Sequence, residues 1–132
     1  KLGKGPYYTF YRPYHLTSLE VPLSCARAVL YGTADMQPLP HPSSEVCAVA
    51  KKDLRPGDTL DSIGEYAYRA WIMTYEGAAA AQAIPCGLLE NGKVTKSIRK
   101  GELITYGNTT VDQDSRIVAL RKRQDDLLAG NG

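Results

Sequence analysis

Two side chains near the start of the sequence have the chemistry of an anion-binding site. Arg12 and His15 flank Pro13 and Tyr14, just ahead of a predicted helix. A helix N-terminus presents unpaired backbone N–H groups, and a nearby arginine can add a bidentate contact to a phosphate or carboxylate. We therefore take Arg12 and His15 as candidate substrate-binding residues for a small anionic ligand. In the alternative, Arg12 pairs with an acidic residue and His15 packs beneath Tyr14.

Four acidic residues in the middle of the chain resemble a metal-binding cluster: Asp53, Asp58, Asp61 and Glu65. They fall at expected turns, where acidic side chains aid solubility and Asp often accepts hydrogen bonds from nearby backbone N–H groups. We expect these residues to serve the turns and predict no metal site. The residues of this chain suggest no catalytic group either.

Two basic pairs, Lys51–Lys52 and Arg99–Lys100, border two predicted turns. If the fold brings these turns together, the four side chains could form a small anion site. The alternative is a solvated surface, on which exposed charges contribute little to binding or stability.

The three cysteines, Cys25, Cys47 and Cys86, have spacings that fit neither a metal knuckle nor a paired disulfide framework. Cys47 and Cys86 lie in apolar segments, so we expect buried thiols and not nucleophiles. Scattered, unpaired cysteines point to a reducing compartment. The sequence also lacks an apolar run of roughly 20 residues and a signal-peptide pattern, so we predict a cytoplasmic protein with no membrane partner.

The composition is that of a folded, soluble domain. Hydrophobic residues make up 43% of the chain and charged residues 23%, with a formal net charge of +2. Basic and acidic residues alternate along most of the sequence, and the cluster Arg121–Arg123 is followed at once by Asp125 and Asp126. We therefore expect a solvated helix face there, and no nucleic acid as partner.

The first 44 residues predict a strand, a helix and a linker. Aromatic residues that favour β-structure fill Tyr7–Tyr14. Thr17 and Glu20 fit a capping box, which predicts a helix over about Leu19–Tyr31, ending at the glycine that follows. Prolines and serines then dominate Asp35–Ser44, a composition typical of a linker or long surface loop.

A duplicated turn is the most informative pattern in the sequence. Asp53–Leu60 contains a Pro-Gly pair that predicts a type II turn, because glycine tolerates a positive φ at the second central position. Five residues recur at a constant offset of 44 positions, which indicates two similar strand–turn–strand units packed about a pseudo-twofold axis with their aliphatic residues in one core. The matched pairs are Leu54 with Ile98, Arg55 with Arg99, Gly57 with Gly101, Asp58 with Glu102 and Leu60 with Ile104.

Shorter sequence patterns predict the remaining helices and strands. Val46–Ala50 is typical of a buried strand, and Thr74 is a plausible N-cap for a short helix. The segment Pro85–Val94 predicts a strand leading to a hairpin turn at Asn91–Gly92. Apolar residues at helical spacing predict an amphipathic helix over Ser115–Leu128.

Together these elements predict a mainly β fold with short helices, of the α+β class. Residues 1–44 form the strand–helix preamble and linker, residues 45–110 a small β-rich domain, and residues 111–132 a C-terminal helix. The chain opens with a Gly- and Pro-rich loop and without an initiator methionine, so we expect a fragment of a longer protein.

The two turn segments, Lys51–Leu60 and Ser97–Tyr106, resemble the SAF (antifreeze-like, β-clip) family. Its members include type III antifreeze proteins, the tail of sialic acid synthase, flagellar P-ring chaperones and sugar-acid dehydratases. The family pattern has a first "D-L-x-x-G-x-x-L" turn, a "P-x-G" stretch matched here by Pro85 and Gly87, and a second "I-x-x-G-E-x-I/L" turn. The resemblance covers residues 45–108 and implies a β-clip fold.

A further resemblance includes the preamble. Gly5–Tyr8, Tyr11–Leu16 and Ile117–Leu128 are similar to the C-terminal part of homoserine-dehydrogenase-like NAD(P)-dependent oxidoreductases that end in an SAF domain, a group that includes proteins similar to deoxyxylulose-phosphate reductoisomerase. This resemblance implies a structural, oligomerising or cleft-covering role, with NAD(P) bound by residues outside this chain. The chain contains no G-x-G-x-x-G or Walker-type loop, so we expect it to bind no cofactor and to be inactive alone.

Two partner classes stay open. In the oxidoreductase interpretation the partner is the remainder of the same polypeptide or a homo-oligomer. The alternative is a stand-alone SAF-type binding module for a sugar acid or another small anionic ligand. Ice binding is less compatible with the sequence, because the turn tips are charged.

Overall fold

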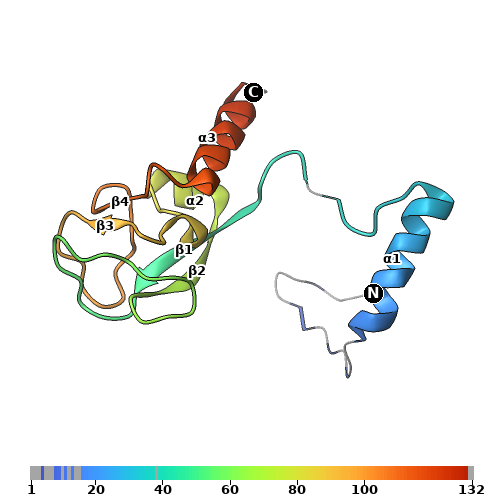
Figure 1. Cartoon of the computed structure of the whole chain (residues 1–132), viewed down its shortest axis with the longest axis horizontal. Helices are drawn as coiled ribbons and strands as arrows, with labels where there is room; N and C mark the ends of the chain where they lie inside the picture. The colour runs from blue at the N-terminus through green and yellow to red at the C-terminus, as the bar shows by residue number, and fades with distance from the viewer. Residues whose placement is uncertain are drawn as a thin grey trace. The chain divides into compact units, whose positions relative to one another are not determined.

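The computed structural model describes Lys4, Tyr8, Thr9, Tyr11, Pro13 and residues 16–37 and 39–130, and it divides the chain into two units, Lys1–Pro38 and Leu39–Gly132 (Figure 1). The element order is α1 (Thr17–Tyr31), β1 (Ser44–Ala50), β2 (Tyr68–Thr74), α2 (Tyr75–Ala80), the 3₁₀ helix η1 (Cys86–Leu88), β3 (Lys93–Val94), β4 (Thr109–Thr110) and α3 (Arg116–Ala129). The fold is therefore small and of mixed α and β type.

The first unit contains the predicted helix, which begins earlier than the sequence indicated. Leu16 is the N-cap residue of α1, and its carbonyl accepts from the backbone N–H of Glu20 at 2.9 Å. Thr17 already lies inside the helix, so the expected capping box is wrong, and no described side chain caps this end. Gly32 ends the helix as expected, with a left-handed φ of 64° and its N–H bonded to Ala28.

The predicted strand Tyr7–Tyr14 falls mostly on residues outside the described set. Of its eight positions only Tyr8, Thr9, Tyr11 and Pro13 are described, and none of these four lies in a strand.

The second unit is organised around the antiparallel ribbon of β1 and β2. Their register runs from Ser44 opposite Thr74 to Ala50 opposite Tyr68. The other side of β1 is met by single bridges, Cys47 to Pro85 and Val49 to Leu103. A second, two-residue ribbon joins β3 and β4. In Figure 1 both ribbons lie in the body of this unit, and α3 extends away from them.

The two predicted turn segments hydrogen-bond to each other with twofold regularity. Leu54 donates its backbone N–H to the Ile98 carbonyl at 2.8 Å, and Ile98 donates to the Leu54 carbonyl at 3.0 Å. Three more bonds recur as equivalent pairs with equal N···O distances: Gly57 to Val94 with Gly101 to Ala50 (2.8 Å), Leu60 to Gly92 with Ile104 to Ala48 (2.9 Å), and Val94 to Asp58 with Ala50 to Glu102 (3.0 Å). The predicted pseudo-twofold packing is confirmed.

Each turn closes in the same way. The N–H of Asp58 donates to the Arg55 carbonyl and that of Glu102 to the Arg99 carbonyl, both at 3.0 Å. The acidic side chain then accepts from the arginine N–H, at 2.8 Å in both turns. Gly57 and the equivalent Gly101 have φ values of 93° and 86°, which only glycine adopts without strain.

The aliphatic residues beside the turns meet in one core. Leu54, Leu60, Ile98 and Ile104 are each at most 2% exposed, as the duplicated pattern predicted. Ile84, Leu89 and Tyr68 fill the space between them. Burial of this apolar area is the main force that stabilises so small a unit.

Two local predictions need correction. The segment after Pro85 forms the 3₁₀ helix η1 and a tight turn, so the strand begins only at Lys93. The turn runs from Leu89 to Gly92, with Gly92 donating to the Leu89 carbonyl at 2.9 Å, so it is not centred on Asn91–Gly92. Glycine is needed at position 92 because a Cβ there would lie 2.9 Å from the Leu89 oxygen.

Three other elements match the sequence analysis. The strand predicted over Val46–Ala50 is the inner part of β1. Thr74 caps α2, with its Oγ1 accepting from the Gly77 N–H at 3.1 Å. α3 agrees with the predicted C-terminal helix within a residue at each end. None of the described helices is both long and apolar enough to span a membrane.

The glycines of the two turns should be equally sensitive to substitution. We expect Gly57→Ala and Gly101→Ala each to lower the free energy of unfolding by about 1–2 kcal/mol, because alanine is strained at positive φ. Gly87→Ala is the control, since a Cβ there meets open space and its φ is not positive. Urea denaturation measures all three variants. A loss at Gly57 or Gly101 no larger than that at Gly87 would contradict the turn geometry.

Candidate functional site

The sequence-predicted substrate residues, Arg12 and His15, lie outside the described residues. Their role as an anion-binding pair therefore stays a prediction. The functional surfaces described below all belong to the second unit.

The acidic side chains of the loops accept hydrogen bonds from backbone N–H groups. Asp61 accepts from the N–H groups of Tyr66 (2.8 Å) and Ala67 (3.0 Å), and Asp53 accepts from the Lys100 N–H at 2.8 Å. With Asp58 in the first turn, these contacts confirm the expected turn-stabilising role of three of the four acids. Within the described part of the chain, no group of three or more His, Cys, Asp or Glu residues is arranged to hold a metal ion.

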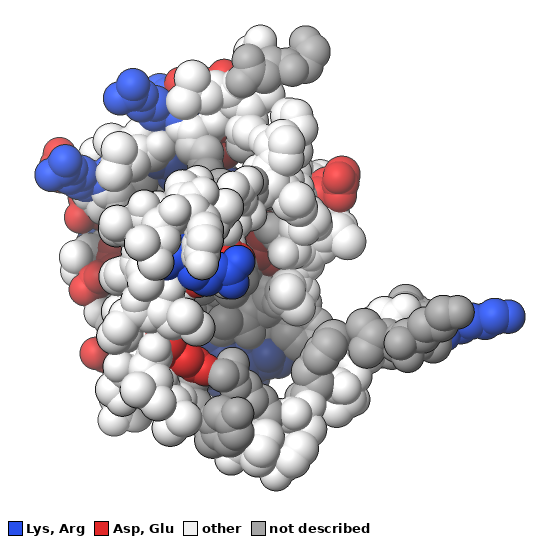
Figure 2. All heavy atoms as spheres, turned by 90° about the vertical axis from the view of Figure 1, so that its right-hand side faces the viewer, with Lys and Arg blue, Asp and Glu red and all other residues white. Residues whose placement is uncertain are grey.

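The two basic pairs lie on the two turn segments that the twofold packing brings together, and the small anion site between them stays a prediction. The Lys51 ammonium donates to the Glu65 carbonyl, and the Lys100 backbone N–H is taken by Asp53. Figure 2 shows Lys and Arg side chains scattered among acidic and uncharged ones on the face that it presents.

Two of the three cysteines are sheltered thiols. Cys47 is fully buried on β1, and Cys86 is partly buried in η1. Desolvation raises the pKa of both thiols above the usual value, and nearby Glu45 raises each further. A raised pKa lowers the fraction of reactive thiolate, so neither cysteine has the character of a nucleophile.

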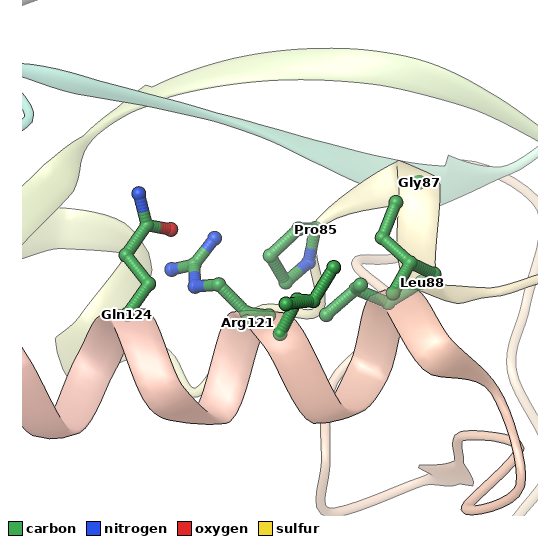
Figure 3. Close-up of a pocket in the computed structure, with 7 residues that line it drawn as sticks. Pro85, Gly87, Leu88, Arg121 and Gln124 are labelled. Carbon is green, nitrogen blue, oxygen red and sulfur yellow. The ribbon is translucent and has the colours of Figure 1, made fainter.

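An apolar groove lies between α3 and η1 (Figure 3). Its volume is about 400 Å³. It is lined by Pro85, Gly87, Leu88, Ile117, Leu120, Arg121 and Gln124. In Figure 3 the side chains of Arg121 and Gln124 rise from α3 on the side of the helix that faces Pro85. A groove with mostly aliphatic walls, whose one cation is already paired with carboxylates, is better suited to packing against another protein surface than to catalysis.

Arg121 joins α3 to β1 through the carboxylate of Glu45, and Asp125 of the same helix holds its guanidinium as well. Its Nη1 lies 2.6 Å from Glu45 Oε2, and its Nε donates to Asp125 Oδ1 at 2.8 Å. Partial burial alone would lower the pKa of Arg121, but the hydrogen bonds and the negative charges of Asp125 and Glu45 together more than offset it, so the net pKa is raised. The expectation of a purely solvated face at Arg121 is therefore wrong. The pairing of Arg121 with Asp125 could be predicted from the sequence, because the two residues lie one helical turn apart. The pairing with Glu45 could not, because Glu45 is far away in sequence.

Outside this ion pair, α3 has a sparse attachment. Val118 packs against the core at the start of the helix. Ile117, Leu120 and Leu127 remain 53%, 54% and 60% exposed. The helix therefore presents an apolar stripe that continues from the groove.

Removing the Arg121 side-chain charge should loosen α3. We expect Arg121→Met to lower the free energy of unfolding by about 1–3 kcal/mol, because Glu45 would keep a half-buried charge without its partner. The matched control is Arg123→Met, on an exposed position of the same helix, with an expected change within about 0.5 kcal/mol. Urea denaturation and amide hydrogen exchange of α3 measure the effect. Equal exchange rates in the two variants would argue against the anchoring role.

Comparison with models of known protein families finds no match to this sequence, and comparison with curated proteins finds none either. The geometry on its own describes a turn-paired α+β unit with an apolar groove, and it identifies no family.

Proposed function

We propose that this chain is the C-terminal, SAF-type region of a homoserine-dehydrogenase-like NAD(P)-dependent oxidoreductase. The observation that carries the proposal is the pairing of two similar turns about a pseudo-twofold axis. These turns are the segments whose sequences resemble the two SAF motifs, and each contributes its aliphatic residues to a shared core. A β-clip fold would account for both the short strands and the duplicated turns.

The proposed role is structural, oligomerising or cleft-covering. A groove of about 400 Å³ and the exposed apolar residues of α3 form an apolar surface, and such surfaces are typical of protein–protein interfaces. The remainder of the same polypeptide, or a second copy, is the proposed occupant. We propose a cytoplasmic protein that has neither nucleic acid nor a membrane as a partner.

Hydride transfer would depend on residues outside this chain. The sequence contains no G-x-G-x-x-G after a strand, which in Rossmann folds lets the backbone approach the pyrophosphate of the cofactor. In the full-length protein, Arg12 and His15 would line the substrate cleft and bind an anionic substrate.

Cofactor titration tests the oxidoreductase proposal. We expect NADPH to give no saturable binding to the isolated chain, and micromolar binding to the protein translated with its upstream reading frame, because that frame would encode the dinucleotide-binding unit. Isothermal titration calorimetry measures both. Saturable micromolar binding by the isolated chain, or a start codon directly before Lys1, would contradict the proposal.

A charge on the apolar stripe of α3 tests the covering role. Leu120 is half exposed, so we expect Leu120→Asp to change the stability of the isolated chain by no more than about 1 kcal/mol. In the longer protein the same change should weaken oligomerisation or lower the melting temperature, because the residue would be covered there. Lys122→Asp is the control on an exposed position of the same helix. Size-exclusion chromatography and thermal melting measure the effect. Equal oligomeric state and equal melting temperature for the two variants of the longer protein would contradict the covering role.

A further inference from the structure

A second hollow of the folded unit lies on one face of the β1–β2 ribbon. Its volume is about 240 Å³, and it is lined by Val49, Arg69, Trp71, Met73, Gly101 and Leu103. The register explains the grouping, because Val49 is paired with Arg69 on one side and bridged to Leu103 on the other. Side chains that lie opposite one another in paired strands share a face, and Trp71 and Met73 follow Arg69 on that face at every second residue.

Arg69 is the charged group of this hollow. Its guanidinium carbon lies 4.9 Å from the centre of the Trp71 ring, a cation–π contact that orients the group without neutralising its charge. Among the described residues, no carboxylate forms an ion pair with Arg69. The turn that contributes Gly101 also carries Glu102, whose carboxylate accepts from the Arg99 N–H and forms no ion pair with Arg69. The guanidinium therefore keeps donors for an external anion.

The remaining walls are apolar or bare backbone. Val49 is buried at the floor, Leu103 and Met73 are partly buried, and the indole of Trp71 is 48% exposed. Gly101 adds no side chain, since its positive φ is required by the turn. A sugar or sugar acid needs several hydrogen-bonding groups, which these walls do not supply. A flat ring bearing a single carboxylate matches one arginine beside an indole and aliphatic side chains.

We propose that this hollow binds a small aromatic carboxylate, with the carboxylate on Arg69 and the ring against Trp71, Val49 and Leu103. The volume lies just below the range of about 300–1,000 Å³ typical of drug-sized ligands, so the hollow has room for one ring and its carboxylate. The stacked guanidinium is already oriented, which reduces the conformational entropy lost on binding. This inference is independent of the oxidoreductase proposal, because it uses residues of the isolated chain only.

The chain provides its own reporter for this site, because Trp71 is its one tryptophan. We expect benzoate to change the tryptophan fluorescence of the full chain in a saturable way, with a dissociation constant in the millimolar range. Benzamide has the ring without the charge, and acetate has the charge without the ring. Each should bind at least about tenfold more weakly, as expected for loss of a charge-assisted hydrogen bond or of the stacking surface. Gluconate tests the sugar-acid alternative and should also bind at least tenfold more weakly.

Substitution of the arginine separates specific binding from general quenching. Arg69→Gln should reduce benzoate affinity about tenfold and leave the weak benzamide affinity unchanged, while Arg123→Gln on α3 should leave both unchanged. Circular dichroism verifies the fold of each variant, and no loss of fold is expected because Arg69 is exposed. The proposal is overturned if benzoate gives no saturable change, if Arg69→Gln binds benzoate as tightly as the unmodified chain, or if gluconate binds as tightly as benzoate.

Discussion

The reciprocal backbone hydrogen bonds between Leu54 and Ile98 are the interaction on which the folded unit depends. Its second ribbon, β3 with β4, has only two residues in each strand, and isolated short hairpins are marginal in water. The unit is stable because each turn segment satisfies the backbone groups of the other half, with Gly57 bonded to Val94 and Gly101 to Ala50. Because the two turn segments form backbone hydrogen bonds with each other across the pseudo-twofold axis, two halves that would be marginally stable alone share one core.

The two halves differ in the segments that follow each turn, and these segments contribute residues to both surface hollows. After the first turn the chain continues into β2 and then α2 and η1, whereas after the second it continues into the short strand β4 and then α3. A smaller difference lies at the turns: Asp53 accepts from the Lys100 N–H, but its equivalent, Ser97, faces the position of Pro56, which has no N–H to donate. The repeat therefore supplies the shared core, whereas residues of β2 complete the Arg69 hollow beside the second turn, and α3 forms the apolar groove with η1.

This division explains what the sequence could predict. The turns were predictable because Pro56, Gly57 and Gly101 report local backbone geometry, and a duplicated pattern specifies a long-range partner as well as a local shape. The Arg121–Glu45 ion pair was not predictable, since nothing local connects a helix residue to a strand so far away in sequence. β2 was also hard to assign, because both of its faces are partly exposed and the usual alternation of apolar and polar residues is absent.

One strand connects the two hollows. Glu45 anchors Arg121 beside the α3 groove, and Val49, four residues further along β1, forms the floor of the Arg69 hollow. Between them Cys47 is fully buried and bridged to Pro85, which also lines the groove. Because β1 is paired with β2 along its whole length, it cannot shift at one end without disturbing the register at the other. A partner of the kind proposed for α3 would therefore contact a helix anchored to the same strand that shapes the proposed carboxylate-binding hollow.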